Sequence, residues 1–284
     1  MTEKIGLIAD SCCDLPQQTA DIQSVPLKIR VGDHTEYTDD GSVDIPALLA
    51  DIAHAQRAVR SSCPSVSAYA ECMRQHDMCF VVTLSAKLSG SYHAACVARQ
   101  IVLEESPERQ IHVFDSKSAS AGEAELLLFL QEQIAQGLPF ETIVHHANVH
   151  IAQTHTLFVL EDLSILRKNG RLSLVSGLIA SVLSICPVMS DNGDGEIRML
   201  AKVRGILPAL SRLTSTVMDM TRSAARQSIR LVISNCNCPE RAQTLRNDLL
   251  NDCPALKEIV MLSTGALSST YANNGGIIIA FAQS

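Results

Sequence analysis

Short apolar runs alternate with helix-like segments through the first half of the chain, and this alternation constrains the fold more than any other feature. The strand-like runs lie at 5–9, 25–31, 79–83 and 111–114, and the helix-like segments at 46–56, 66–75, 90–103 and 122–136. Strands that alternate with helices in this way form mostly parallel sheets covered by helices. We therefore predict an N-terminal α/β domain over residues 1–155.

Clusters of hydroxyl residues accompany these runs, at Ser11, at Ser61-Ser62, over 83–91 and over 116–120. Ligands of parallel α/β sheets bind at the carboxyl ends of strands. One interpretation is that the hydroxyl groups converge on a single ligand. The other is that they only cap the helices that follow, as Ser89 would do before Gly90. Ligand binding and helix capping are compatible, because the N–H groups and positive dipole end of a helix N-terminus also attract an anionic ligand.

The pattern changes after residue 155, and we predict a C-terminal α+β domain over 156–284. It contains a hairpin of 185–189 and 197–201, whose turn holds two glycines suited to positive φ. The remaining predicted elements are strands at 157–160, 229–234, 258–262 and 276–281, a short helix ending at 168, and helices at 207–222 and 239–250. The apolar segment 175–189 is predicted as a buried helix that runs into a strand.

Composition narrows the classes of partner. The 284 residues are 46% hydrophobic and carry a net charge of -7, so a sizeable core is expected but no general attraction to nucleic acid or anionic lipid surfaces. The N-terminus lacks the pattern of a signal peptide, and the longest apolar run is shorter than the ~20 residues of a membrane span. We expect a cytoplasmic protein without stable membrane insertion, whose ten cysteines are mostly reduced thiols.

Motifs for catalysis or metal binding are weak. The chain has no nucleophile elbow, P-loop, dinucleotide fingerprint or paired metalloprotease histidines. A triad of Asp10, Ser11 and His93 is conceivable, but turn and cap roles are favoured. A metal bound by the histidines at 145, 146, 150 and 155 would need further ligands from elsewhere in the chain, which favours a solvated helix face over a metal site. We expect no catalytic residue, no metal and no cofactor.

Six separated motifs, in order, resemble the DegV family of bacterial fatty-acid-binding proteins over essentially the full length. They are 8–16 (IADSCCDLP) with 25–27 and 37–41, then 61–65 (SSCPS), 84–92 (LSAKLSGSY), 115–120 (DSKSAS), 160–173 (LEDLSILRKNGRLS) and 202–205 (KVRG). The resemblance implies a two-domain α/β protein that holds one long-chain fatty acid in an apolar tunnel between its domains. It also implies a partner, an ATP-dependent acyl kinase that converts the bound acid to acyl-phosphate.

The family motifs suggest site residues by position. The predicted ligand-binding residues are Ser61, Ser62, Ser89, Gly90, Ser91, Thr270 and Tyr271. Arg171 and Arg204 are predicted at the pocket mouth or at the surface that docks the kinase. Some positions depart from the family: Tyr271 stands where histidine is common, and Cys186 and Asn235 replace the usual lysine and histidine. A tyrosine hydroxyl can donate to a carboxylate, but it supplies no positive charge near neutral pH.

The sequence therefore favours a non-catalytic carrier that binds a long-chain fatty acid and presents its carboxylate to a kinase. Two alternatives remain open. The first is an enzyme of the serine-hydrolase or acyl-transfer kind. The second is a regulatory scaffold without a physiological lipid, in which the serine loops only cap helices.

Overall fold

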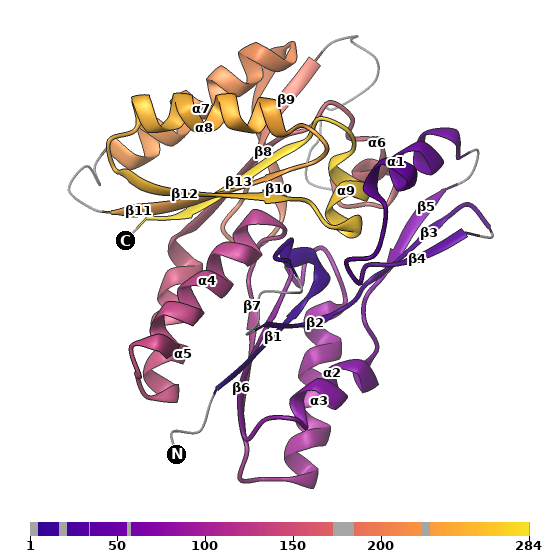
Figure 1. Cartoon of the computed structure of the whole chain (residues 1–284), viewed down its shortest axis with the longest axis vertical. Coiled ribbons are helices and arrows are strands. Elements are labelled where there is room, and N and C mark those ends of the chain that lie inside the picture. Colours follow the sequence, from indigo (N-terminus) through magenta and orange to yellow (C-terminus); the bar gives the residue numbers. More distant parts are fainter. Residues whose placement is uncertain are drawn as a thin grey trace.

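The computed structural model describes residues 5–16, 22–33, 35–55, 58–172, 185–222 and 228–283, which form three sheets with helices between and around them (Figure 1). The first is a parallel four-stranded sheet. In spatial order its strands are β2 (Ile22–Val25), β1 (Gly6–Asp10), β6 (Met78–Thr83) and β7 (Gln110–Asp115). Both faces are covered, so the central strands are nearly continuous apolar runs, as the sequence predicted.

The second sheet has six strands and is mixed, because β11 and β12 are parallel while its other pairs are antiparallel. In spatial order its strands are β10 (Ile197–Arg204), β9 (Ile185–Asp191), β8 (Thr154–Val159), β13 (Ile277–Ala282), β11 (Ile229–Asn235) and β12 (Leu256–Ser263). Strands β9 and β10 confirm the predicted hairpin. Of the predicted segment 175–189, the part up to 184 lies outside the described residues.

Helices and the two sheets stack in five layers (Figure 1). The outer helices are α7 (Ile206–Thr221) and α8 (Pro239–Asp252) over the six-stranded sheet, and α2 (Val66–Met73) and α3 (Ser91–Glu105) on the four-stranded sheet. Between the sheets lie α4 (Ala121–Ala135) and α5 (Phe140–Gln153). Helix α4 contacts strands of both sheets and has little polar surface, so it is the layer that joins the two halves.

A small antiparallel sheet stands beside these layers, in the order β4 (Thr35–Thr38), β3 (Lys28–Val31) and β5 (Val59–Ser62). It packs with α1 (Ile45–His54), η1 (Ser11–Cys13) and α9 (Ala266–Ala272), close to α6 (Ser164–Lys168). The single strand predicted over 25–31 is wrong, because the chain passes from one sheet to another there. Between β2 and β3 the Leu27 N–H donates to Ser11 Oγ (3.0 Å), and the Leu27 carbonyl accepts from the Asp39 N–H (2.9 Å).

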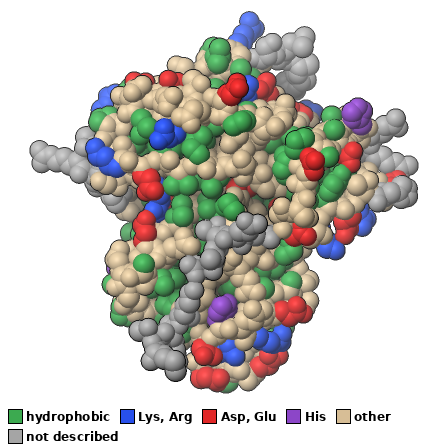
Figure 2. Space-filling view, in the orientation of Figure 1, with side chains coloured by type: hydrophobic (Ala, Val, Ile, Leu, Met, Phe, Trp, Pro, Cys, Tyr) green, Lys and Arg blue, Asp and Glu red, His purple; other side chains and the backbone are tan. Residues whose placement is uncertain are grey.

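The structure confirms a mixed α/β fold with a parallel sheet and a separate second sheet. The domain boundary after residue 155 stays a prediction; β8, the first strand of the six-stranded sheet along the chain, begins at Thr154. In the part of the chain that the structure describes, no helix is long and apolar enough to cross a bilayer. Basic and acidic side chains are interspersed on the face shown in Figure 2.

Candidate functional site

A cavity of about 360 Å³ lies where the three sheets meet. Much of its wall is apolar and comes from both halves of the chain: Leu27, Leu84, Leu88, Phe158, Leu160, Leu166, Ile197, Leu267 and Ile278. Hydroxyl residues from three of the four predicted clusters also line it: Ser61, Ser62, Ser89, Ser118 and Ser120. The fourth predicted position, Ser11, does not line the cavity, although its neighbour Cys12 does. Three of the four predicted hydroxyl clusters thus converge on one cavity.

One group of polar side chains, here called the hydroxyl–arginine cluster, consists of Ser61, Tyr271 and Arg171. Ser61 is in β5 and Tyr271 is in α9, and their hydroxyl oxygens are 2.7 Å apart. The Arg171 guanidinium carbon is 6.0 Å from the centre of the Tyr271 ring. Its Nε donates to the carbonyl of Leu88 (3.1 Å) and its Nη1 to that of Asn169 (2.5 Å). The cluster therefore places a cation and two hydroxyls at the cavity wall.

Ser62, Ser89 and Gly90 also line the cavity, as predicted for ligand-binding residues. Ser61 and Ser62 end strand β5 and do not cap α2, since the cap of that helix is Ser65, whose Oγ accepts from the Ala68 N–H. Ser61 and Ser62 therefore do not act as caps of the helix that follows them.

Ser89 does have a local role at the N-terminus of α3. Its Oγ accepts from the Ser91 N–H at 3.3 Å. A Cβ added to Gly90 would lie 3.3 Å from Cys63 Sγ, so glycine leaves room for that thiol at the cavity wall. Ser89 thus lines the cavity and also accepts a hydrogen bond from the first residue of α3, although the cap position of that helix is Gly90.

Two other predicted residues do not line the cavity. Ser91 is fully buried, where its Oγ donates to Asp10 Oδ2 (2.6 Å) and lies 2.6 Å from the Tyr69 hydroxyl. Thr270 is also buried, and its Oγ1 donates to the Ala266 carbonyl within α9 (2.8 Å). The Ser91 hydroxyl bonds to two buried side chains and the Thr270 hydroxyl to the backbone of its own helix, so both positions suit a supporting role.

Arg204 is absent from the cavity lining as well. It is exposed at the end of β10, an edge strand, opposite Ile185. The register shifts between Met199 and Ala201, so residues of β10 change faces there. Met199 packs in the apolar cluster on the inner side of the sheet, whereas Ala201 and Val203 pack on the outer side. Arg204 consequently projects from the inner side, the side that carries the cavity.

Helix α9, which carries Tyr271, is held at its N-terminus by two aspartates from the other half of the chain. Asp39 accepts from the N–H groups of Ala266 (2.8 Å) and Leu267 (3.0 Å). Asp14 accepts from the Gly265 N–H at 2.9 Å. These bonds satisfy N–H groups that a helix terminus leaves free, and they fix the helix against the small sheet.

Behind the cavity wall three carboxyl groups are buried: Asp10, Asp14 and Glu123. Burial raises the pKa of Asp10 to about 6 and that of Asp14 to about 6, although hydrogen bonds from O–H and N–H groups oppose the rise. Burial, and then the charge of Asp10, raise the pKa of Glu123 well above its usual range. Within the described residues neither carboxyl oxygen of Glu123 has a hydrogen-bond partner.

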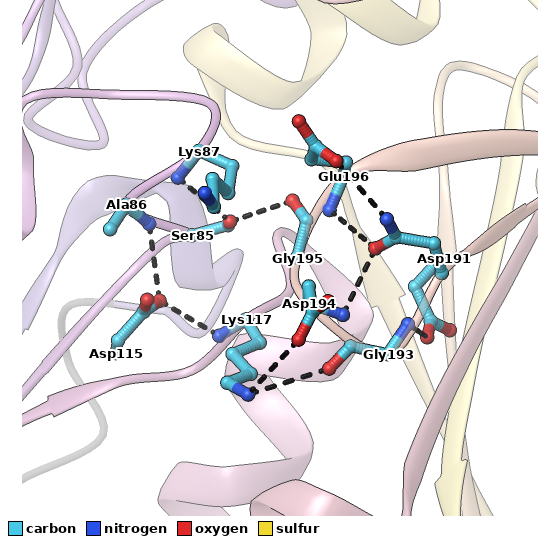
Figure 3. A network of polar contacts seen from close by, with 11 residues as sticks. Ser85, Ala86, Lys87, Asp115, Lys117, Asp191, Gly193, Asp194, Gly195 and Glu196 are labelled. Atoms are coloured by element: carbon cyan, nitrogen blue, oxygen red, sulfur yellow. Dashed lines mark hydrogen bonds and ion pairs between the residues drawn. The ribbon is translucent and has the colours of Figure 1, made fainter. Parts of the chain in front are cut away.

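The turn between β9 and β10 lines another part of the cavity. Figure 3 shows its polar contacts with the loops that carry Ser85 and Lys117. Ser85 Oγ donates to the Gly195 carbonyl at 2.7 Å, and Lys117 Nζ lies 3.8 Å from a carboxylate oxygen of Asp194. Gly195 has φ +86°, and a Cβ there would be 2.3 Å from Ser85 Oγ. Glycine is therefore required for the turn to reach the loops that follow β6 and β7.

Several lining residues escaped the sequence-based prediction of the site: Lys117, Ser118, Thr156, Asp191 and Glu196. Ser118 was signalled by its hydroxyl cluster, and the turn was predicted only as hairpin chemistry. Nothing in the local sequence shows that this turn contacts two distant loops, one through Ser85, 110 residues from Gly195, and one through Lys117, 76 residues from Gly193.

The catalytic and metal alternatives receive little support from the geometry. Ser11 Oγ accepts from the Leu27 N–H, and His93 is exposed on α3; within the described residues no hydrogen bond joins the two. His145 and His146 are exposed on α5, as expected, but His150 bonds to Glu125 and stacks on Phe129.

Among the described residues, the side chains close enough to share a cation are Asp10, Cys12 and Glu123. This group contains no histidine, and burial raises the pKa of its thiol well above the usual range.

Comparisons with known proteins give one consistent result. A family model described as an uncharacterised protein of the DegV family matches residues 4–283. A DegV domain-containing protein of Streptococcus pneumoniae is 34% identical over 99% of both chains. A DegV family crystal structure from Ruminococcus gnavus, described with vaccenic acid, is 38% identical over 98% of this chain and 99% of that one (TM-score 0.92). The S. pneumoniae Fatty Acid Kinase (Fak) B3 protein, loaded with linoleic acid, is 32% identical over 99% and 100% (TM-score 0.89).

Proposed function

Because the chain belongs to the DegV family, we propose that it binds one long-chain fatty acid in the cavity between its sheets, with the carboxylate at the hydroxyl–arginine cluster. The observation that carries this proposal is the polar group of Ser61, Tyr271 and Arg171 in an otherwise largely apolar wall. The cavity volume of about 360 Å³ falls in the usual range of ligand pockets, roughly 300–1,000 Å³.

Tail and head group contribute differently to such binding. Each buried methylene gains about 0.8 kcal/mol, so an acyl chain supplies most of the affinity. A buried carboxylate is costly unless hydrogen bonds replace its water, and charge-assisted bonds contribute roughly 1.5–3 kcal/mol each. Ser62 and Ser89 add two hydroxyls to those of Ser61 and Tyr271. The hydroxyls therefore select an acid and fix its orientation.

The first test removes two of these donors. Ser62→Ala combined with Ser89→Ala should weaken binding of hexadecanoic acid to the delipidated protein by about tenfold or more, because charge-assisted hydrogen bonds are lost. Isothermal titration calorimetry measures the dissociation constant.

Two controls sharpen this test. The double variant should leave the affinity for methyl hexadecanoate nearly unchanged, since the ester carries no charge. Ser67→Ala, an exposed hydroxyl of α2 outside the cavity lining, should change neither affinity. Equal binding of the acid by wild type and double variant would contradict the proposed carboxylate site.

We further propose that the chain presents the acid to an ATP-dependent acyl kinase and performs no catalysis itself. The similarity to the Fak B3 protein supports this role. So does the position of the carboxylate site, since Ser62 and Gly90 are both exposed at the cavity wall. Arg204 is exposed on the same side of the sheet and is available for docking.

The second test separates docking from lipid binding. Arg204→Glu should lower acyl-phosphate formation by a fatty-acid kinase at least tenfold, while the dissociation constant for hexadecanoic acid stays within twofold. Arg198→Glu is the matched control, because it reverses a charge on the same strand before the register shift. If both variants slow the kinase equally, a general charge effect replaces the specific role of Arg204.

A further inference from the structure

A second polar group of the cavity has no role in holding a carboxylate. Ser118, from the loop after β7, and Thr156, from β8, both line the cavity, and their hydroxyl oxygens are 2.6 Å apart. We call these two residues the distal pair. Both side chains are more than nine-tenths buried. The two hydroxyls bond to each other, but they keep hydrogen-bonding capacity that a hydrocarbon tail would leave unused.

Strand β8 shows how far the distal pair lies from the hydroxyl–arginine cluster. Thr156, Phe158 and Leu160 alternate along one side of the chain and all line the cavity. A strand rises about 3.3 Å per residue, so Thr156 and Leu160 are roughly 13 Å apart. Leu160 is next to Ala272 of α9, because side-chain atoms of both would lie 2.9 Å from a Cβ on Gly276. Leu160 therefore marks the end of the cavity at which Tyr271 lies. An apolar part of the wall separates this end from Thr156.

The hydrogen-bonding capacity of the distal pair indicates which group it accepts. Two hydroxyls bonded to each other still have acceptor lone pairs, whichever of them is the donor. A ligand hydroxyl can donate to such a lone pair. It can also accept a hydrogen when the Thr156 hydroxyl is not the donor within the pair; the Ser118 hydroxyl has a second acceptor in the Ala119 carbonyl, 3.5 Å away. Thr156 is fixed by its backbone, since its N–H donates to Asp191 Oδ2 at 2.7 Å.

Charge at this end argues against a second carboxylate. Asp191 and Glu196 line the same region, against one lysine, Lys117. Lys117 is itself 3.8 Å from an oxygen of Asp194 and is 42% exposed. A carboxylate placed beside the distal pair would meet more negative than positive charge and would lose its water.

From this geometry we propose that the cavity accepts a fatty acid oxygenated in the distal half of its chain, a hydroxy fatty acid, whose hydroxyl bonds to Ser118 and Thr156. The inference rests on the proposed fatty-acid site and specifies its substrate class. The bound hydroxyl replaces its lost water with the distal pair, and the carboxylate stays at the hydroxyl–arginine cluster.

The test compares matched ligands on the delipidated full chain by calorimetry: hexadecanoic acid, its 12-hydroxy and 16-hydroxy derivatives, and hexadecanedioic acid. In an apolar tunnel the added hydroxyl would weaken binding about tenfold or more. We expect instead that at least one hydroxy acid binds as tightly as the parent or tighter, and that the dioic acid binds at least tenfold more weakly.

A double variant assigns the effect to the distal pair. Ser118→Ala with Thr156→Val should weaken the preferred hydroxy acid about tenfold relative to hexadecanoic acid. Thr154→Val is the control, because that hydroxyl lies on the same strand but bonds the His150 carbonyl and does not line the cavity.

Each contrary outcome is recognisable. If hexadecanoic acid binds and both hydroxy acids bind tenfold more weakly, the distal pair holds water, and this inference fails while the fatty-acid site stands. The wild-type ligand series decides this even if the double variant does not fold. Failure of every acid to bind would overturn the fatty-acid site together with this inference.

Discussion

At the scale of single residues, Glu123 is exceptional because it is a carboxyl group with 0% exposure and no hydrogen-bond partner among the described residues. It lies in the first turn of α4, where a helix terminus favours negative charge, but Asp10, at the end of β1, and Asp14, just beyond it, are close to Glu123. Cys12, Cys13 and Tyr69 are further titratable groups near it. Burial beside two other acids favours the protonated form of Glu123.

This arrangement predicts how stability depends on pH. A carboxyl group whose pKa is raised in the folded state binds more protons there than in the unfolded chain, so the free energy of unfolding falls as pH rises. For Asp10 and Asp14 the fall runs from about pH 4 to about pH 6, and for Glu123 it continues above that. Glu123→Gln should therefore stabilise the protein at pH 8 by roughly 1 kcal/mol or more, and much less at pH 5.

Chemical denaturation at the two pH values measures this difference. Glu132→Gln serves as the control, because Glu132 lies on the same helix, is 53% exposed and pairs with Arg230. That variant should show no gain at high pH. A pH-independent effect of Glu123→Gln would mean that Glu123 is ionised in the folded protein.

At the scale of elements, α9 is a helix whose position depends on residues distant in the sequence. It spans seven residues, rich in serine and threonine, and would not be stable in isolation. Asp14 and Asp39, more than 220 residues earlier in the chain, accept hydrogen bonds from its N-terminal N–H groups. The orientation of Tyr271 towards Ser61 therefore rests on contacts between the two halves.

Asp39→Ala should both destabilise the protein by about 1–3 kcal/mol and weaken binding of hexadecanoic acid several-fold, because two N–H groups lose their acceptor and α9 shifts. Asp44→Ala is the matched control, since Asp44 caps α1 by accepting from the Ala47 N–H, and no residue of α1 lines the cavity. Denaturation and calorimetry on both variants separate the two effects. If they lose stability but keep equal affinity, α9 is not the element that orients the carboxylate site.

At the scale of the whole molecule, the two halves are joined by polar contacts around the cavity as well as by the apolar layer of α4. Ser85 holds the β9–β10 turn through the Gly195 carbonyl, and Ser118 contacts Thr156. Arg230 of β11 pairs with Glu125 of α4 at 3.2 Å, where the two side chains are 12% and 3% exposed. These contacts hold the two halves together around the cavity, so both halves contribute residues to its wall.

Much of the layered fold could be predicted from the sequence, because period and length are local properties of the chain. The buried parallel strands β1, β6 and β7 are short apolar runs, and longer helix-like segments predicted α1, α2, α3, α4, α7 and α8. The predictions missed β4, β5, α5 and α9. Strands of four residues and a serine-rich helix of seven carry too little periodicity and become regular only through packing against the rest of the molecule.

For the site, the sequence by itself determined which residue types are present: hydroxyl clusters at Ser61-Ser62, Ser89 and Ser118, and a family motif that includes Arg171. Only the tertiary structure decided which of them share a cavity. Residues close in sequence, such as Ser89 and Ser91 or Thr270 and Tyr271, point to different surroundings, because side chains one or two positions apart in or next to a helix face different directions. The pairing of Ser61 with Tyr271, 210 residues apart, arises from packing of the small sheet against α9, and no local pattern encodes it.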